Sequence, residues 1–142
     1  MGLNQLRLGD VYAGGDNTLA VELLYSLLKE RTPDVNISHV ETPGFAQHQR
    51  FVLSRPYHAW YVVIVGCKYV GAVYLTKINE IGVFILKEHH RKGYGLGAVV
   101  ELMALHPREK YLANTNPDNF ASMQMFQQLG FNHIQNTLRL GT

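Results

Sequence analysis

Residues 81–103 read IGVFILKEHHRKGYGLGAVVELM, and this stretch decides how the rest of the chain is organised. An apolar run leads into a basic segment, then into the alternate glycines Gly93, Gly95 and Gly97, and then into an apolar pattern at helical spacing. Glycines let a backbone approach an anion without a Cβ in the way. The N–H groups and the dipole of a helix N-terminus favour negative charge. The stretch therefore predicts a strand, a glycine turn and a helix start that together bind an anion such as a phosphate.

Composition places the chain among ordinary globular proteins. With 142 residues, of which 46% are hydrophobic, we expect one domain spanning residues 1–142. The formal net charge of +2 is too small to indicate nucleic-acid binding. The single cysteine, Cys67, excludes an intrachain disulfide, and no apolar run is long enough to span a bilayer or to form a signal peptide. We expect a cytoplasmic protein with no membrane or nucleic-acid partner.

The first part of the chain predicts one strand and two helices. Residues 5–12 alternate weakly and indicate a strand, and a helix capped by Asp16 or Asn17 follows. Thr42 and Pro43 form a second helix start, because a hydroxyl cap precedes a proline at the first helical position. We expect this second helix to bury the apolar side chains Phe45, Phe51 and Val52.

The middle of the chain predicts most of a sheet. The runs 59–65 and 69–75 are rich in β-branched and aromatic residues and flank a short turn, which indicates an antiparallel hairpin. A third strand is expected at residues 80–86. A helix over residues 94–106 then leads to a short strand at 111–114, which would pair in parallel with 80–86.

The C-terminal part predicts a helix and a last strand. Asp118 or Asn119 caps a helix, Gly130 fits the left-handed position after it, and Phe131 closes the helix end. Residues 133–140 indicate a final strand. The whole pattern predicts an α+β fold with a central, mostly antiparallel sheet of six to seven strands, one parallel strand pair, and about four helices on both faces.

The glycine loop has three interpretations that differ in the ligand. A P-loop needs Gly-Lys followed by Ser or Thr, which the chain lacks. Residues 93–98 match the loose dinucleotide pattern G-x-G-x-x-A, but polar residues 87–92 separate the strand from the glycines, and no carboxylate follows about 20 residues later for a ribose. Three glycines at a helix start lower the stability of the helix, and a loop without a ligand would give no reason for that loss.

Two blocks resemble the GNAT superfamily of acetyl-CoA-dependent N-acetyltransferases. Residues 90–95, HRKGYG, resemble its pyrophosphate loop, Gln/Arg-x-x-Gly-x-Gly/Ala, which also follows a strand. Residues 119–131, NFASMQMFQQLGF, resemble its C-terminal pattern Asn-x-x-Ser-x-x-x-Tyr-x-x-x-Gly-Phe. The resemblance covers about residues 57–140 and implies a GNAT-like fold with acetyl-CoA as co-substrate and no metal.

The resemblance also implies how the cofactor is held. Amides of the glycine loop would bind the CoA pyrophosphate, the end of the preceding strand would pair with the pantetheine arm, and the second block would border the thiol end. The residues expected to bind the cofactor are Ile85, Leu86, Arg91, Lys92, Gly93, Tyr94, Gly95, Leu96, Gly97, Asn119, Ser122 and Phe126. Two positions depart from the family: His90 stands where Gln or Arg is usual, and Phe126 stands where a Tyr often protonates the leaving thiolate.

Two residues are candidates for a general base. Glu80 and Ile81 resemble the Glu-Ile pair that supplies the base in some family members, and His48 lies on the helix that borders the acceptor cleft in this fold. A general base contributes roughly 10²–10⁴-fold to such a rate. Tyr57, Trp60 and Tyr61 are further candidates for lining an acceptor site.

The resemblance implies transfer of an acetyl group from acetyl-CoA to a primary amine by direct attack within a ternary complex. The acceptor stays open between a protein N-terminus, an amino sugar and a small amine, and the protein is expected as a monomer or a homodimer. The alternative is a catalytically idle GNAT-like domain that binds CoA or a partner, which the phenylalanine at position 126 would suit.

Overall fold

The computed structural model describes residues 5–30 and 43–141. These residues form a five-stranded sheet in the order β1-β2-β3-β4-β5. The first three neighbouring pairs are antiparallel and the β4–β5 pair is parallel. The strands are β1 (Leu6–Asp10), β2 (Ala59–Val65), β3 (Lys68–Leu75), β4 (Glu80–Ile85) and β5 (Leu112–Ala113). The helices are α1 (Thr18–Glu30), α2 (Phe45–Leu53), the short 3₁₀ turn η1 (Lys87–His89), α3 (Tyr94–Leu105) and α4 (Phe120–Gln128).

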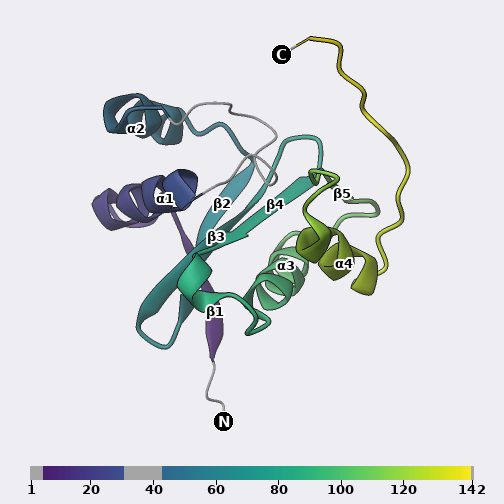
Figure 1. Ribbon diagram of the computed structural model, residues 1–142. Coiled ribbons are helices and arrows are strands. Elements are labelled where there is room, and N and C mark those ends of the chain that lie inside the picture. The colour runs from purple at the N-terminus through teal and green to yellow at the C-terminus, as the bar shows by residue number, and fades with distance from the viewer. Residues whose placement is uncertain (1–4, 31–42, 142) are drawn as a thin grey trace.

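Helices cover both faces of the sheet, as the sequence predicted. Figure 1 shows α1 and α2 on one side of the strands and α3 and α4 on the other. Side chains alternate across a strand, so β2, β3 and β4 each contribute to two separate cores. On the α1 side the core joins Val21, Leu24 and Trp60. On the α3 side it joins Val73, Leu102 and Phe126.

The end of α4 has the geometry that its sequence predicted. Gly130 adopts φ 100°. The N–H of Phe131 donates to the carbonyl of Phe126 over 3.0 Å, and the N–H of Gly130 donates to Gln127 over 3.0 Å, which is a Schellman motif. The rings of Phe126 and Phe131 pack edge to face at 5.0 Å. This end fixes Phe126 in the core, with 5% of its surface exposed.

Three local expectations were wrong. Residues 133–140 form no strand, so the described residues form a sheet of five strands rather than the expected six to seven, and in Figure 1 this segment runs away from the sheet. The neighbouring strand β5 is only two residues long, so it offers few backbone groups for another strand to pair with. On α2, Phe45 and Phe51 are each 41% exposed, although Val52 is fully buried as expected. The helix begins at Phe45 after a Gly44 cap, and Thr42 lies outside the described residues.

Gly71 allows the close approach of β3 and β4. A Cβ built on Gly71 would lie 2.3 Å from the carbonyl oxygen of Phe84 and 3.0 Å from Cα of Ile85. Both neighbours are backbone atoms, so the strands themselves would have to separate.

We therefore expect Gly71→Ala to lower the free energy of unfolding by about 1–3 kcal/mol, the usual cost of overpacking. The matched control is Gly15→Ala, because a Cβ there meets nothing within 4 Å. Urea denaturation of both variants measures the difference. Equal stability of the two variants would contradict the close packing of β3 on β4.

Candidate cofactor and acceptor site

The parallel pairing of β4 with β5 stops after two residue pairs. Glu80 lies opposite Leu112 and Ile81 lies opposite Ala113. Within the part of the chain that the structure describes, β4 has no ladder partner on this side from Gly82 to Ile85. The two strands therefore leave a gap, and the backbone of β4 forms one edge of it.

Hydrogen bonding to β3 decides which β4 groups face the gap. The N–H of Leu86 donates to the carbonyl of Val70 over 2.9 Å, so Leu86 directs its amide toward β3. Backbone amides of successive strand residues point to opposite sides of the strand. Val83 and Ile85 therefore direct their amides into the gap. Sequence reasoning placed Leu86 at this edge and missed Val83. Which amides face the gap depends on the register between β4 and β3, which the sequence does not show.

The glycine loop leads into a helix start that has unused amide donors. Gly93 adopts φ 78° and precedes α3 without a side-chain cap. Inside the helix the N–H of Gly97 already donates to Gly93. No acceptor is found among the described residues for the amides of Tyr94, Gly95 and Leu96. Three parallel donors at a helix N-terminus form an anion site.

Gly95 joins this anion site to the gap. A Cβ on Gly95 would lie 3.3 Å from Sδ of Met125 on α4 and 3.7 Å from Cγ1 of Ile85 on β4. The start of α3 thus meets the end of β4 and one side of α4 at this glycine. A ligand bound to the helix start can therefore continue along the open edge of β4.

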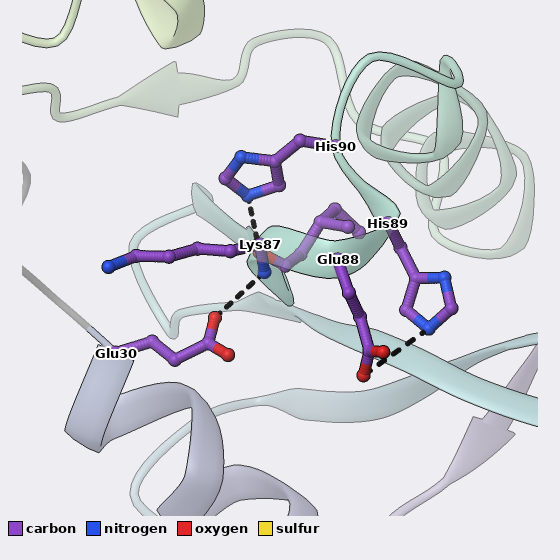
Figure 2. Close-up of polar contacts among 6 residues, drawn as sticks. Glu30, Lys87, Glu88, His89 and His90 are labelled. Carbon is purple, nitrogen blue, oxygen red and sulfur yellow. Dashed lines mark hydrogen bonds and ion pairs between the residues drawn. The ribbon is translucent and has the colours of Figure 1, made fainter.

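Contacts within the loop and with α1 hold the segment between β4 and α3. The ring Nε2 of His90 lies 2.7 Å from the carbonyl oxygen of Ile85, and Figure 2 shows the ring turned back onto the strand end. A carbonyl only accepts, so Nε2 donates in this bond. The N–H of Lys87 donates to Oε1 of Glu30 at the end of α1 over 2.8 Å. His90 thus supports the loop from within. Arg91 and Lys92 are exposed beside the glycines.

A cleft of about 750 Å³ lies at the other end of the gap. It brings together seven of the residues singled out from sequence: Glu80, His48, Asn119, Ser122, Phe126, Tyr57 and Trp60. The first two come from β4 and α2, the next three come from α4 and its cap, and the last two come from β2 and the segment before it. The glycine loop itself does not line the cleft; the open edge of β4 connects the two places.

Glu80 is held in place by three hydrogen bonds. Its Oε2 accepts a bond from Nδ2 of Asn114 over 2.6 Å. Its N–H donates to Oγ1 of Thr76 over 2.9 Å, and its carbonyl accepts from the N–H of Thr76 over 2.8 Å. Asn114 follows β5, so this contact spans the cleft end of the strand pair. Sequence reasoning did not find Asn114, which lies 34 residues from its partner.

The turn before Glu80 is tied to the end of α3. Asn79 adopts φ 65°, and its Oδ1 accepts a bond from Nε of Arg108 over 3.1 Å.

Nearby, Nε2 of His106 lies 2.7 Å from the Tyr61 hydroxyl. Burial lowers the pKa of His106, and the neighbouring His58 and Arg108 lower it further. The neutral ring is therefore favoured, and Tyr61 contacts this group rather than lining the cleft.

His48 occupies a different environment from Glu80. It is 5% exposed, and its ring lies 5.3 Å from that of Tyr25 on α1. It reaches the cleft from the helical side. The cleft therefore contains both candidate bases, Glu80 at the strand end and His48 between the helices.

The α4 side of the cleft has one polar cap and one aromatic wall. Oδ1 of Asn119 accepts a bond from the N–H of Ser122 over 3.2 Å, so the predicted helix cap is confirmed. Phe126 lies one turn further along and carries no proton to donate.

Among the described residues, no group of three or more His, Cys, Asp or Glu side chains is arranged to hold a metal ion. In that same part of the chain, no helix is both long and apolar enough to cross a membrane.

Comparisons with known proteins agree with this geometry. A domain from Methanocaldococcus jannaschii has a similar fold at a TM-score of 0.74 and 18% identity, covering 94% of this chain and 92% of that one. The spermidine/spermine N-acetyltransferase SpeG from Vibrio cholerae matches at 0.69 and 18% identity, covering 90% and 80%. The protein yncA from Salmonella typhimurium, solved with its cofactor acetyl-CoA, matches at a TM-score of 0.66 and 15% identity, covering 90% of this chain and 79% of that one. No curated protein sequence matches the chain.

The sequence model of the acetyltransferase (GNAT) family matches residues 21–131, which is more than half of the chain. This match includes the open edge of β4, the glycine loop and the α4 block. The family supports acetyl transfer in general. The chain belongs to the GNAT acetyltransferase family.

Proposed function

We propose that this protein transfers an acetyl group from acetyl-CoA to a primary amine by direct attack within a ternary complex. The observation that carries the proposal is the open edge of β4, which connects an uncapped helix start to a cleft containing an oriented carboxylate. Such an edge fits a long cofactor with a charged end and a reactive end. The SpeG and yncA neighbours, one an N-acetyltransferase and one solved with acetyl-CoA, support the same assignment.

The helix start of α3 suits the CoA pyrophosphate. Amides of Tyr94, Gly95 and Leu96 would donate to phosphate oxygens, with Gly93 leaving room for the approach. Gly97 instead lets α3 pack on β1, because a Cβ on it would lie 3.2 Å from Cδ1 of Leu6. Arg91 and Lys92 would pair with the remaining charge from the exposed side of the loop. His90 takes the place of the family's Gln or Arg by bonding to the strand end rather than to phosphate.

The open edge of β4 suits the pantetheine arm. The strand runs from Glu80 to Ile85, and the loop follows Ile85. The amide of Ile85 would therefore pair with the arm near the loop, and the amide of Val83 would face the thioester carbonyl closer to Glu80. An N–H placed there in advance stabilises the oxyanion that develops during attack, an effect worth about 3–4 kcal/mol where it has been measured.

Glu80 is the proposed general base. It would remove a proton from the acceptor ammonium, directly or through one water, and pass it to solvent. The amine nitrogen then attacks the carbonyl carbon, the C–N bond forms, the C–S bond breaks, and the nitrogen releases its second proton to solvent as the amide forms. Asn114 keeps the Glu80 carboxylate turned toward the cleft. His48 stays the second candidate for this role.

Phe126 means that α4 supplies no acid for the leaving thiolate. A free thiol has a pKa of about 8.5, so the thiolate can leave near neutral pH and take its proton from water. Phe126 is also what favours the rival function, an idle domain that binds CoA without turnover. Release of free thiol from acetyl-CoA in the presence of an amine panel separates the two, because the idle domain would bind CoA and release none.

We expect Gly95→Val to weaken acetyl-CoA binding by at least about tenfold, or about 1.4 kcal/mol. A valine side chain there would project into the meeting point of β4, α3 and α4. Calorimetric titration with acetyl-CoA measures the affinity, and the melting temperature without ligand reports any loss of fold. Gly15→Val is the control, since that glycine lies in an open loop. Unchanged affinity in a folded Gly95→Val variant would contradict the cofactor path.

We expect Glu80→Gln to reduce the turnover number by roughly 10²–10⁴-fold. The change keeps the acceptor for Asn114 but removes the basic oxygen, so acetyl-CoA affinity should hardly move. Thiol release measures the rate, with the exposed Glu101→Gln variant on α3 as control. An unchanged rate would exclude Glu80 as the base. A loss of rate in His48→Gln, with Glu80→Gln unaffected, would assign the role to His48.

A further inference from the structure

The proposed base lies directly after a tight turn that a distant arginine contacts. We propose that Arg108 is a positioning residue for Glu80: by holding Asn79, it fixes the start of β4 and with it the place of the carboxylate in the cleft. This inference rests on the proposed acetyl transfer with Glu80 as base. It gives Arg108 no contact with either substrate.

The turn between β3 and β4 has a left-handed residue at its last position. The N–H of Asn79 donates to the carbonyl of Thr76 over 3.1 Å, which closes a β-turn, and Asn79 itself adopts φ 65°. A three-residue hairpin loop commonly ends in such a conformation, and asparagine tolerates it better than most residues. Glu80 follows at once, so the conformation of Asn79 sets the direction in which β4 begins.

Two partners on the β5 side hold Asn79. Its carbonyl accepts a bond from the N–H of Leu112 over 2.9 Å, which ties the turn to the start of β5. Its Oδ1 accepts a bond from Nε of Arg108 over 3.1 Å, although the two residues lie 29 positions apart in the sequence. The second bond joins the turn to the connection between α3 and β5, and fixes the side chain as well as the backbone.

The guanidinium of Arg108 uses all three of its nitrogens. Besides the bond from Nε to Asn79, one terminal nitrogen donates to the carbonyl of Pro107 over 2.9 Å, and the other lies 3.2 Å from Nε2 of His58. Arginine only donates, so Nε2 of His58 accepts. These bonds hold an exposed side chain in one orientation. A planar fork of donors can make them together, whereas the ammonium of a lysine is a single point on a flexible stem.

The carboxylate of Glu80 depends on the position of this turn. Its Oε2 accepts a bond from Nδ2 of Asn114 over 2.6 Å. Asn114 directly follows β5, so this bond requires the start of β4 to lie at a fixed distance from the end of β5. A shift of the turn would lengthen the bond and turn the carboxylate away from its place in the cleft. Misplacement of a reacting group by 1 Å can cost about 10²-fold in rate.

We expect Arg108→Lys to lower kcat for thiol release about tenfold, because lysine keeps the charge but not the fork of donors. The affinity for acetyl-CoA should hardly change, since α3 has 12 residues and places about 18 Å between Arg108 and the glycine loop. Lys110→Gln, at an exposed position on the same connection, is the control. An unchanged kcat, or a rate that falls only as far as the folded fraction falls, would contradict the inference.

The variant Asn79→Gly removes the same contact from the side of the turn. Glycine adopts the left-handed conformation without strain, so the hairpin should still form, and we expect a similar loss of kcat. Because both changes break one contact, the double variant with Arg108→Lys should lose no more rate than the weaker single variant. Losses that multiply in the double variant would show that the two residues act independently, and would overturn the inference.

A measurement without turnover separates this inference from the proposed function. The side-chain amide of Asn114 donates to Glu80, so its proton resonance reports the place of the carboxylate. We expect Arg108→Lys to move this resonance toward its value in Glu80→Ala, where the bond is absent, and Lys110→Gln to leave it unchanged. An unmoved resonance in Arg108→Lys would overturn the positioning role, whether or not thiol is released. A moved resonance in a protein that releases no thiol would support that role and refute only acetyl transfer.

Discussion

The site of this protein depends on the pairing between β4 and β5, which ends after two residue pairs. Beyond these two pairs, β4 keeps its bonds to β3 while no strand among residues 5–30 and 43–141 pairs with its other edge. An open edge inside a sheet is costly unless something pairs with it. The open edge of β4 lies between the amide donors at the start of α3 and the cleft that contains Glu80. The gap makes them parts of one site.

In the proposed reaction, the two faces of the sheet would serve different substrates. Ile85 and Val83 pack toward the α3 core, and their edge leads from the glycine loop. Trp60, Tyr74 and Phe84 pack toward α1 and α2, where the acceptor would enter. Glu80 is the first residue of β4, and its carboxylate accepts a hydrogen bond from Asn114, which follows β5. The proposed ternary complex would need both substrates within reach of this carboxylate, and holding reactants in that geometry supplies much of an enzyme's rate.

Local chemistry made much of this fold predictable from sequence. A left-handed Gly130, an Asn119 cap and a glycine-rich helix entry each depend on a few neighbouring residues, and each was found where it was expected. Features that depend on register or on distant partners were not predictable. Strand pairing decides three such features. The amide of Val83 rather than that of Leu86 faces the open edge, Asn114 contacts Glu80, and the Tyr74 ring lies across Gly82. The expected last strand at 133–140 alternates suitably, but the short β5 leaves it little to pair with.

Hydrogen exchange at single amides of β4 tests the open edge most directly. Without ligand, we expect the amides of Val83 and Ile85 to exchange quickly, while those of Phe84 and Leu86 are protected by bonds to β3. Saturating acetyl-CoA should slow exchange at Ile85 and Val83 and leave Leu86 nearly unchanged. Protection of Val83 and Ile85 before any ligand is added would contradict the gap. If the amides of Val83 and Ile85 still exchanged quickly with acetyl-CoA bound, the result would contradict binding of the cofactor along the open edge of β4.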